Sequence, residues 1–503
     1  MDEQVEQVPK GPILDIESAI RDAIAAGASD LPSPEELEFS TPVILILLGL
    51  SLYTIYCIWK SRGTLLEKGI AFLTCHFLIT GEYDYFYTIP APGFDFQPPR
   101  LLFFAFSGIL LVEHFFSKTK YVKPPSADKV AWYEIFLYLF IFYNIISQFF
   151  HLDELELKDV IVTAMYQLYI LVIYMTMKKY VSAELIRLIC HCMIVGAVVA
   201  CLIGIYQFVK DPLALRIGDY RIAFGSYLRA NGTFTNEYFY AYFVIIAICW
   251  TIIFIKNIWV KNALLGLFII GVFISFQRMS WLVLSLLMAL YVFKILKIRY
   301  EVMAFVATGA TIVLIVLGLI FSQDLMNSTL VKQRLSEKPD GRLGYWGMVI
   351  NNIGKSPFWG YGGTQTKTYF QEMLKVTHSR ERATAAEGDL HSGYLSTMFY
   401  FGVPSFVFFV FFILSSIIYY LKLLPKHQFF AIPFLLAVLY LVANGTNTLL
   451  FDKYISLPLA IHLGLAMGIR RNPQILVELE RTTAIPNTPI ESAHEPNRTI
   501  ERV

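Results

Sequence analysis

Residues 184–209 read ELIRLICHCMIVGAVVACLIGIYQFV, and this stretch decides the kind of fold that the chain can adopt. Its two charged side chains, Glu184 and Arg187, both lie in its first four residues. A run of roughly 20 apolar residues is long enough to cross a bilayer as an α-helix. Comparable runs predict membrane spans at about 42–59, 66–86, 100–117, 131–150, 159–177, 184–209, 238–255, 259–276, 280–297, 301–321, 393–420, 428–444 and 449–469.

The composition supports the same fold class. The chain has 503 residues, of which 56% are hydrophobic and 16% aromatic, and its mean hydropathy is +0.56. A soluble domain could not bury this much apolar surface. We therefore predict an all-α, polytopic helical membrane protein with about 12–13 transmembrane helices and one long extracytoplasmic loop. The formal net charge of +2 indicates no particular partner, and nothing in the chain indicates nucleic-acid binding.

Basic residues occupy every second connection between the predicted spans, while acidic residues such as Glu82, Asp84 and Asp153 lie in connections between them. By the positive-inside rule, the basic connections face the cytoplasm. The loops 322–390 and 210–237 are then extracytoplasmic. The basic set is Lys60, Arg62, Lys68, Lys118, Lys120, Lys123, Lys129, Lys178, Lys179, Arg187, Lys256, Lys261, Lys294, Lys297, Arg299, Lys422, Lys426, Arg470 and Arg471.

This pattern divides the chain into five segments. An acidic N-terminal extension, residues 1–40, carries isoleucines at helical spacing and is expected to form a short amphipathic helix. Residues 41–321 form a transmembrane bundle, 322–390 an extracytoplasmic functional loop, and 391–470 the C-terminal transmembrane helices. Residues 471–503 are polar, contain several prolines, and are expected to be a disordered cytoplasmic tail.

All six cysteines fall inside apolar runs, so we interpret them as small core residues rather than a disulfide framework. Cys190, His191 and Cys192 are adjacent in sequence. On one helix such neighbours point about 100° apart and do not converge on one ion. No metal site and no cofactor are predicted.

The cationic residues carry most of the functional signal. An arginine at or near a membrane span costs roughly 2.5–3.5 kcal/mol, so it usually faces a cavity, a partner or a ligand. Arg278 lies between two apolar runs in a very short connection. It is either a snorkelling interfacial residue or a ligand contact. Arg342 and Trp346 lie one helical turn apart, and Gly360 and Gly362 form a backbone that can approach a ligand closely.

A second polar loop adds Arg216, Arg221 and Arg229, followed by Asn231-Gly232-Thr233-Phe234-Thr235-Asn236. Several arginines on one side of a membrane suggest diphosphate recognition, because guanidinium binds phosphoryl oxygens bidentately. Arg216 and Arg221, taken singly, are better interpreted as residues of a solvated loop.

His391 heads the span that follows the long loop, with Asp389 before it and Tyr394 after it. A lone interfacial histidine is more often structural than catalytic. Beside arginines on the same side of the membrane, an imidazole is a suitable group to orient or deprotonate an acceptor hydroxyl.

In these motifs the chain resembles the O-antigen ligase and O-antigen polymerase family of membrane glycosyltransferases. The resemblance covers roughly residues 190–470, and it depends on the order and spacing of short motifs. These are the run Arg229 to Asn236, then Arg278 and Trp281, then Arg342, Trp346, Pro357, Gly360 and Gly362, and finally His391, Tyr394, Leu395, Phe401 and Gly402.

The resemblance implies a glycosyltransferase of the inner membrane that uses an undecaprenyl-diphosphate-linked glycan and needs no metal or nucleotide. It implies that Arg278 and Arg342 act on the diphosphate and that His391 acts at the acceptor hydroxyl. Further substrate-binding roles are expected for Arg229, Arg221, Trp346, Gly360, Gly362 and Tyr394. Ser392 stands where the family commonly has asparagine, so that amide's contact is replaced or absent here.

Polymerase and ligase share these motifs, so the acceptor remains open: a glycan repeat, lipid A core or a protein. Two further readings also remain open. Intramembrane arginines would suit an anion or inorganic-carbon transporter, although the polar loop and its glycines occur only once and show no paired halves. A structural subunit of polysaccharide assembly would make the arginines dispensable.

Overall fold

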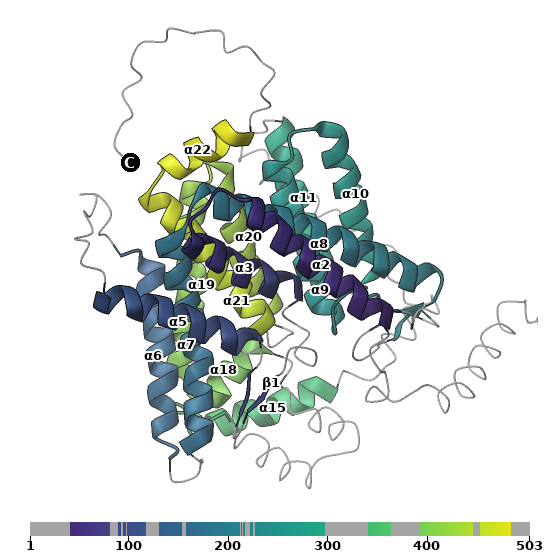
Figure 1. Ribbon diagram of the computed structural model, residues 1–503. Coiled ribbons are helices and arrows are strands. Elements are labelled where there is room, and N and C mark those ends of the chain that lie inside the picture. The colour runs from purple at the N-terminus through teal and green to yellow at the C-terminus, as the bar shows by residue number, and fades with distance from the viewer. Residues whose placement is uncertain are drawn as a thin grey trace, which may run out of the picture.

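The computed structural model describes residues 41–80, 89–91, 94–96, 98–116, 130–152, 157–211, 213, 215–216, 222–224, 227–296, 341–363, 390, 392–445 and 453–483 (Figure 1). The predicted N-terminal extension, the predicted span 301–321 and most of the predicted loop 322–390 lie outside these residues. So do two residues singled out from the sequence, Arg221 and His391.

Helices dominate the described chain, which confirms the predicted all-α membrane class. Three helices are long and apolar enough to cross a membrane by themselves, α8, α9 and α19, and several shorter apolar helices accompany them. The helices are α2 (Thr41–Lys60), α3 (Leu65–Thr80), α5 (Pro98–Phe116), α6 (Trp132–Phe149), α7 (Leu157–Tyr180), α8 (Ala183–Val209), α9 (Glu237–Phe254), α10 (Ile258–Ile274), α11 (Arg278–Leu296), α15 (Gly341–Ile353), α18 (Gly393–Phe401), α19 (Val403–Leu423), η1 (Gln428–Phe430), α20 (Ala431–Ala443), α21 (Lys453–Arg471) and α22 (Gln474–Thr483).

Among the described residues, two short antiparallel strand pairs interrupt the helices. Strand β1 (Ile89–Ala91) pairs with β2 (Phe94–Phe96), and Ile89 lies opposite Phe96. Strand β3 (Ile222–Phe224) pairs with β4 (Tyr227–Leu228) with an irregular register. The second hairpin directly precedes the loop that carries Arg229.

The predicted span 393–420 is two helices rather than one. Helix α18 ends at Phe401 and α19 begins at Val403, with Gly402 between them at φ +89°. A side chain at this position would be strained, and its Cβ would lie 1.9 Å from the carbonyl oxygen of Phe358. Pro404 follows in the first turn of α19, where a proline is favourable. The run is continuous in hydropathy but broken in backbone geometry.

The segment after Arg471 also differs from the prediction of a disordered tail. Residues 474–483 form α22, which packs against α8. Ile475 and Leu479 are buried and lie one helical turn apart. This short apolar period among charged residues is enough to dock one amphipathic helix.

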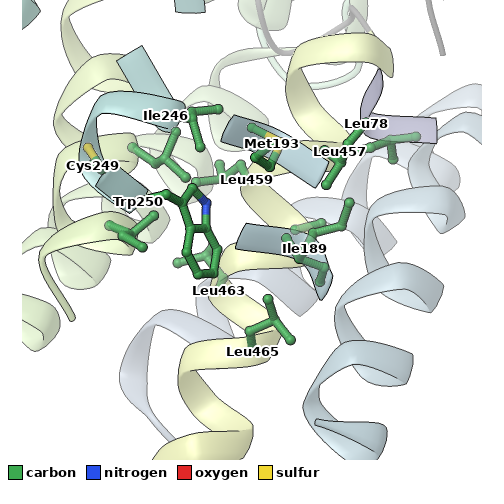
Figure 2. Packing of buried hydrophobic residues seen from close by; sticks show 14 of the residues in the cluster. Leu78, Ile189, Met193, Ile246, Cys249, Trp250, Leu457, Leu459, Leu463 and Leu465 are labelled. Atoms are coloured by element: carbon green, nitrogen blue, oxygen red, sulfur yellow. The ribbon is translucent and has the colours of Figure 1, made fainter. Parts of the chain in front are cut away.

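A core of large apolar side chains holds the middle of the bundle together (Figure 2). Trp250 of α9 is fully buried, and its indole Nε1 donates to His462 Nε2 of α21 at 3.1 Å. Figure 2 shows Met193 of α8 and Leu459 of α21 near this tryptophan. The indole proton therefore has a partner deep inside apolar surroundings, as a buried tryptophan requires.

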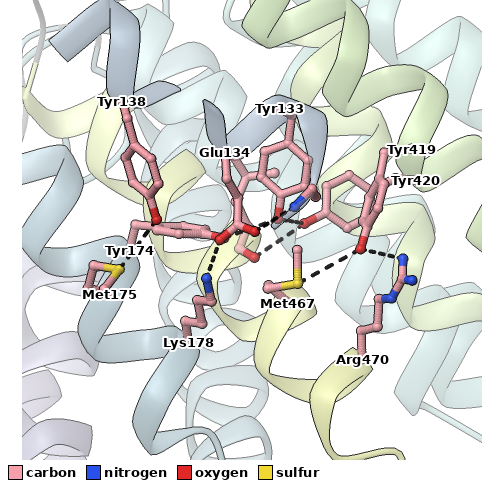
Figure 3. A network of polar contacts seen from close by, with 12 residues as sticks. Tyr133, Glu134, Tyr138, Tyr174, Met175, Lys178, Tyr419, Tyr420, Met467 and Arg470 are labelled. Atoms are coloured by element: carbon pink, nitrogen blue, oxygen red, sulfur yellow. Dashed lines mark hydrogen bonds and ion pairs between the residues drawn. The ribbon is translucent and has the colours of Figure 1, made fainter. Parts of the chain in front are cut away.

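A buried polar network joins the first turn of α6 to the last turns of α7, α19 and α21 (Figure 3). Glu134 is fully buried and accepts hydrogen bonds from Lys178 and, at 2.7 Å, from the hydroxyl of Tyr174. Arg470 donates to the hydroxyl of Tyr419. Lys178 and Arg470 belong to two of the basic connections recognised in the sequence, so these connections meet at one end of the bundle.

Other basic connections gather at the same end. The backbone N of Arg62 lies 3.4 Å from a Glu184 carboxylate oxygen, which brings the end of α2 to the start of α8. Lys261 donates to the carbonyl of Ile252 at 3.2 Å, where α9 gives way to α10. Helix α8 follows α7 after a short connection, and α20 follows α19. The basic connections that the structure describes therefore lie at one set of helix ends.

Small residues let α21 lie close against α7. Gly464 and Gly468 are spaced as in a Gly-x-x-x-Gly motif, which permits close packing of helices in membranes. A Cβ at Gly464 would lie 2.6 Å from the carbonyl oxygen of Tyr174. A Cβ at Gly468 would lie 2.3 Å from Val181 Cγ1 and 2.7 Å from the Lys178 carbonyl oxygen.

We predict that Gly468→Ala destabilises the protein by about 1–3 kcal/mol, because the new methyl group forces α21 away from α7. The matched control is Gly266→Ala in α10, where a Cβ would meet nothing within 4 Å. The measurement is the thermal unfolding midpoint of each purified variant in detergent. Equal midpoints for the two variants would contradict the close packing of α21 on α7.

Candidate functional site

The helix ends opposite the basic connections carry the sequence motifs in two groups: the Arg229 loop with the α10–α11 turn, and α15 with the start of α18. Helices α9 and α10 are joined by three residues, so the start of α9 and the end of α10 lie at the same end of the bundle. The backbone N–H of Ala230 donates to the carbonyl of Ile274 at 3.0 Å, which confirms that the Arg229 loop meets the α10–α11 turn. The backbone N–H of Gly393 donates to the carbonyl of Asn444 at 2.9 Å, which joins the start of α18 to the end of α20.

Gln207, near the end of α8, holds the Arg229 loop. Its side-chain oxygen accepts from the backbone N–H groups of Asn231 at 3.2 Å and Gly232 at 3.0 Å. Its amide nitrogen donates to the carbonyls of Leu215 at 3.4 Å and Gly232 at 3.3 Å. Gly232 has φ +57°, and a Cβ there would lie 2.6 Å from the Ala200 carbonyl oxygen. Asn231 and Gly232 therefore form a tight turn that packs against α8.

Arg216 is not the solvated residue that the sequence suggested. Its side chain is buried, and its guanidinium donates to the carbonyl of Arg229 at 2.6 Å. Burial lowers the pKa of Arg216 to about 10, with Glu237 opposing that shift, so the guanidinium stays charged at neutral pH. The sequence cannot distinguish a buried arginine that bonds to the backbone of a turn from an arginine that faces water, because both lie in a polar loop.

Arg229 forms an ion pair with the first residue of α9. Its Nη1 donates to a carboxylate oxygen of Glu237 at 2.8 Å, and the two side chains are 24% and 4% exposed. One edge of the guanidinium therefore stabilises the loop rather than a ligand. The expected substrate-binding role of Arg229 stays a prediction for the remaining edge.

A short turn places Arg278 at the start of α11. The hydroxyl of Ser275 donates to the carbonyl of Val272 at 2.6 Å and accepts from the backbone N–H of Gln277 at 3.3 Å. Phe276 adopts φ +51°, and its ring lies 6.0 Å from that of Phe208, next to Gln207. The first N–H groups of a helix lack intrahelical partners and carry partial positive charge, so the start of α11 favours an anion.

Trp346 links two motifs that are far apart in the sequence. Its indole Nε1 donates to the carbonyl of Leu390 at 2.8 Å. Arg342 lies one turn earlier in the same helix, α15, and Leu390 directly precedes His391. On the other side of His391, the Ser392 hydroxyl caps α18 by accepting from the Leu395 N–H at 3.4 Å. Both chain neighbours of His391 are therefore held in place.

The glycines after Pro357 make close backbone contacts with α18. Gly360 has φ +69°, and a Cβ there would lie 2.6 Å from the Phe399 carbonyl oxygen. The N–H of Gly362 donates to the carbonyl of Tyr400 at 3.0 Å, and Val403 N–H donates to the carbonyl of Pro357 at 2.7 Å. The sequence predicted a backbone built for close approach, and in the structure the approached group is α18. Ligand contact by Gly360 and Gly362 stays a prediction.

The end of α6 also contacts the glycine-containing segment after Pro357, and the sequence did not predict this contact. The ring of Trp359 stacks on Tyr143, with centroids 5.7 Å apart, and on Phe150, at 3.8 Å. The N–H of Gly363 donates to the side-chain oxygen of Gln148 at 3.2 Å. Gln148 is buried, and a glutamine inside a predicted span was the available signal.

Tyr394 uses its hydroxyl within the protein by donating to the carbonyl of Leu441. This bond ties α18 to α20 beside the Gly393–Asn444 contact. A substrate-binding role for Tyr394 stays a prediction, and the structure gives the hydroxyl a structural one.

The fold and this end of the bundle define a polytopic helical membrane protein with a polar, arginine-bearing region at one set of helix ends. Residues 263–410 match the family model described as O-Antigen ligase, a range that contains α11, α15 and α18. The match confirms the resemblance of the chain to the O-antigen ligase and O-antigen polymerase family. No curated protein matches the chain.

We predict that Trp346→Phe lowers activity by about tenfold, because phenylalanine keeps an aromatic ring but loses the pyrrole part of the indole and with it the bond to Leu390, which is worth about 1 kcal/mol in stability. The reason is that this bond sets the position of the chain just before His391. The measurement is glycan ligation or polymerisation in a deletion strain that expresses each variant at equal level. The control is Trp259→Phe, an 82% exposed tryptophan at the other end of the bundle. Similar activities for both variants would count against a role for the Trp346 bond.

Proposed function

We propose that this protein is a lipid-diphosphate-dependent glycosyltransferase that transfers or polymerises an undecaprenyl-diphosphate-linked glycan onto a sugar hydroxyl. The observation that carries the proposal is the hydrogen bond from Trp346 to Leu390, because it joins the Arg342 helix to the residues that flank His391. The O-antigen ligase match over residues 263–410 supports the enzyme over the transporter and the structural subunit.

In the proposed reaction the acceptor hydroxyl attacks the anomeric carbon of the donor sugar. The bond from that carbon to the diphosphate oxygen breaks, and the diphosphate leaves on its lipid. His391 takes the hydroxyl proton, a contribution of roughly 10²–10⁴ in rate for a well-placed base. Arg278 and Arg342 stabilise the charge that develops on the leaving diphosphate.

Arg278 has a favourable location for this role because it is the first residue of α11. The partial positive charge of the helix N-terminus adds to that of the guanidinium. Arg342 is the second residue of α15 and has the same advantage. Neither role requires a metal ion or a nucleotide.

We further propose that the site faces the extracytoplasmic side of the inner membrane. The support is the separation of helix ends: Lys178, Arg470 and Lys261 mark one end, and the start of α11 lies at the other. The positive-inside rule then puts the basic end in the cytoplasm. The acceptor, a glycan repeat, lipid A core or a protein, would approach from outside.

We predict that Arg278→Lys and Arg342→Lys each lose most of the transfer activity while the protein inserts and accumulates normally. Lysine keeps the charge but not the planar fork that binds phosphoryl oxygens in a bidentate manner. The measurement is glycan analysis of a deletion strain that expresses each variant. Arg62→Lys, at the opposite end, is the control, and near-normal glycan in all three strains would make Arg278 and Arg342 interfacial anchors.

We predict that His391→Ala abolishes transfer but leaves donor binding nearly unchanged, since the diphosphate contacts belong to the two arginines. Purified variant and wild-type proteins are compared for binding of undecaprenyl diphosphate and for turnover per folded molecule. Retained turnover would remove His391 from the mechanism. Loss of binding would instead place it in the diphosphate site.

A further inference from the structure

Three buried polar atoms near the start of α11 have no hydrogen-bond partner among the residues that the structure describes. They are Nε of Arg229, Nε2 of Gln277 and Oγ of Ser280. Gln277 is 7% exposed and Ser280 is fully buried. A buried donor without a partner destabilises the folded protein, so such groups in a native protein require an explanation.

The three atoms belong to one region of the molecule. The bond from Ala230 N–H to the Ile274 carbonyl brings Arg229 beside the α10–α11 turn. Gln277 immediately precedes the first residue of α11. Ser280 is in the first turn, and the Cα–Cβ bond of a helical residue tilts toward the helix N-terminus. The side chains of Gln277 and Ser280 therefore both lie at the helix end that favours anions.

Two neighbouring polar side chains of the same types, Ser275 and Gln207, have partners. The Ser275 hydroxyl makes two hydrogen bonds, and the Gln207 amide makes four. Ser275 and Gln207 build the turn and the loop. Gln277 Nε2 and Ser280 Oγ form no hydrogen bond within the described part of the protein.

We propose that Gln277 and Ser280, together with the Nε–H of Arg229, donate hydrogen bonds to the diphosphate of the glycan donor. All three atoms can donate, and phosphoryl oxygens only accept. Arg229, at 24% exposure, marks where this cluster reaches the surface. The inference rests on the proposed function and adds two residues to the diphosphate site that no sequence motif indicated.

Substituting a buried donor that has no partner should affect stability differently from substituting a donor that has one. Removing a donor that has no partner loses no hydrogen bond in the ligand-free protein and removes a buried polar group, whereas removing a paired donor leaves its partner unsatisfied. The test therefore uses matched pairs in detergent: Gln277→Met against Gln207→Met, and Ser280→Ala against Ser275→Ala. Each variant is assayed for its unfolding midpoint without ligand and for its Kd for undecaprenyl diphosphate.

The expected result is that Gln277→Met and Ser280→Ala unfold at or above the wild-type midpoint but bind undecaprenyl diphosphate about tenfold more weakly, as the loss of a hydrogen bond to a charged group requires. Gln207→Met and Ser275→Ala should unfold at lower temperature. Unchanged Kd values for the first two variants, with wild-type binding intact, would overturn the inference. If wild-type protein binds undecaprenyl diphosphate no better than undecaprenol, the proposed function itself fails.

Discussion

The hydrocarbon core of a membrane offers no water to an unpaired backbone N–H or carbonyl, and this constraint decides where the chain can depart from helix. The break at Gly402 is possible because another segment supplies the missing partners. Pro357 accepts from Val403, and the chain around Gly360 and Gly362 bonds to the end of α18. The segment that repairs the break lies between α15 and α18, so the same bonds that satisfy the backbone also fix the proposed site.

Arginine serves two purposes at this end of the molecule. Arg216 and Arg229 are tied to protein groups, a carbonyl and the carboxylate of Glu237, and they shape the loop beside α8. Arg278 and Arg342 stand at the first turns of two helices, where an anion gains from the helix ends as well as from the guanidinium. In the proposed function, Arg216 and Arg229 shape the loop and Arg278 and Arg342 bind the diphosphate.

The sequence predicted the helices well because a long apolar run has few alternatives in a bilayer. It failed where geometry rather than hydropathy decides. The turn at Gly402 is hidden inside an apolar run, and Arg216 has the same polar neighbours whether its side chain is inside or outside. Helix α22 was missed because Ile475 and Leu479 form too short a period to distinguish from a polar tail. The motif order around Trp346 was informative because a hydrogen bond from its indole to the carbonyl of Leu390 joins two of the motifs in space.

The part of the chain that matches the O-antigen ligase family is held partly by residues outside the matched range. Gln148 of α6 and Phe150, directly after α6, hold the segment before α18, and Gln207 and Phe208 of α8 hold the region before α11. All of these lie outside residues 263–410. Helices α6 and α8 thus position residues 263–410 from outside that range. If residues 263–410 were transferred into another membrane protein, they would lose these contacts. An exchange of substrate specificity between relatives therefore requires α6 and α8 to be transferred with them.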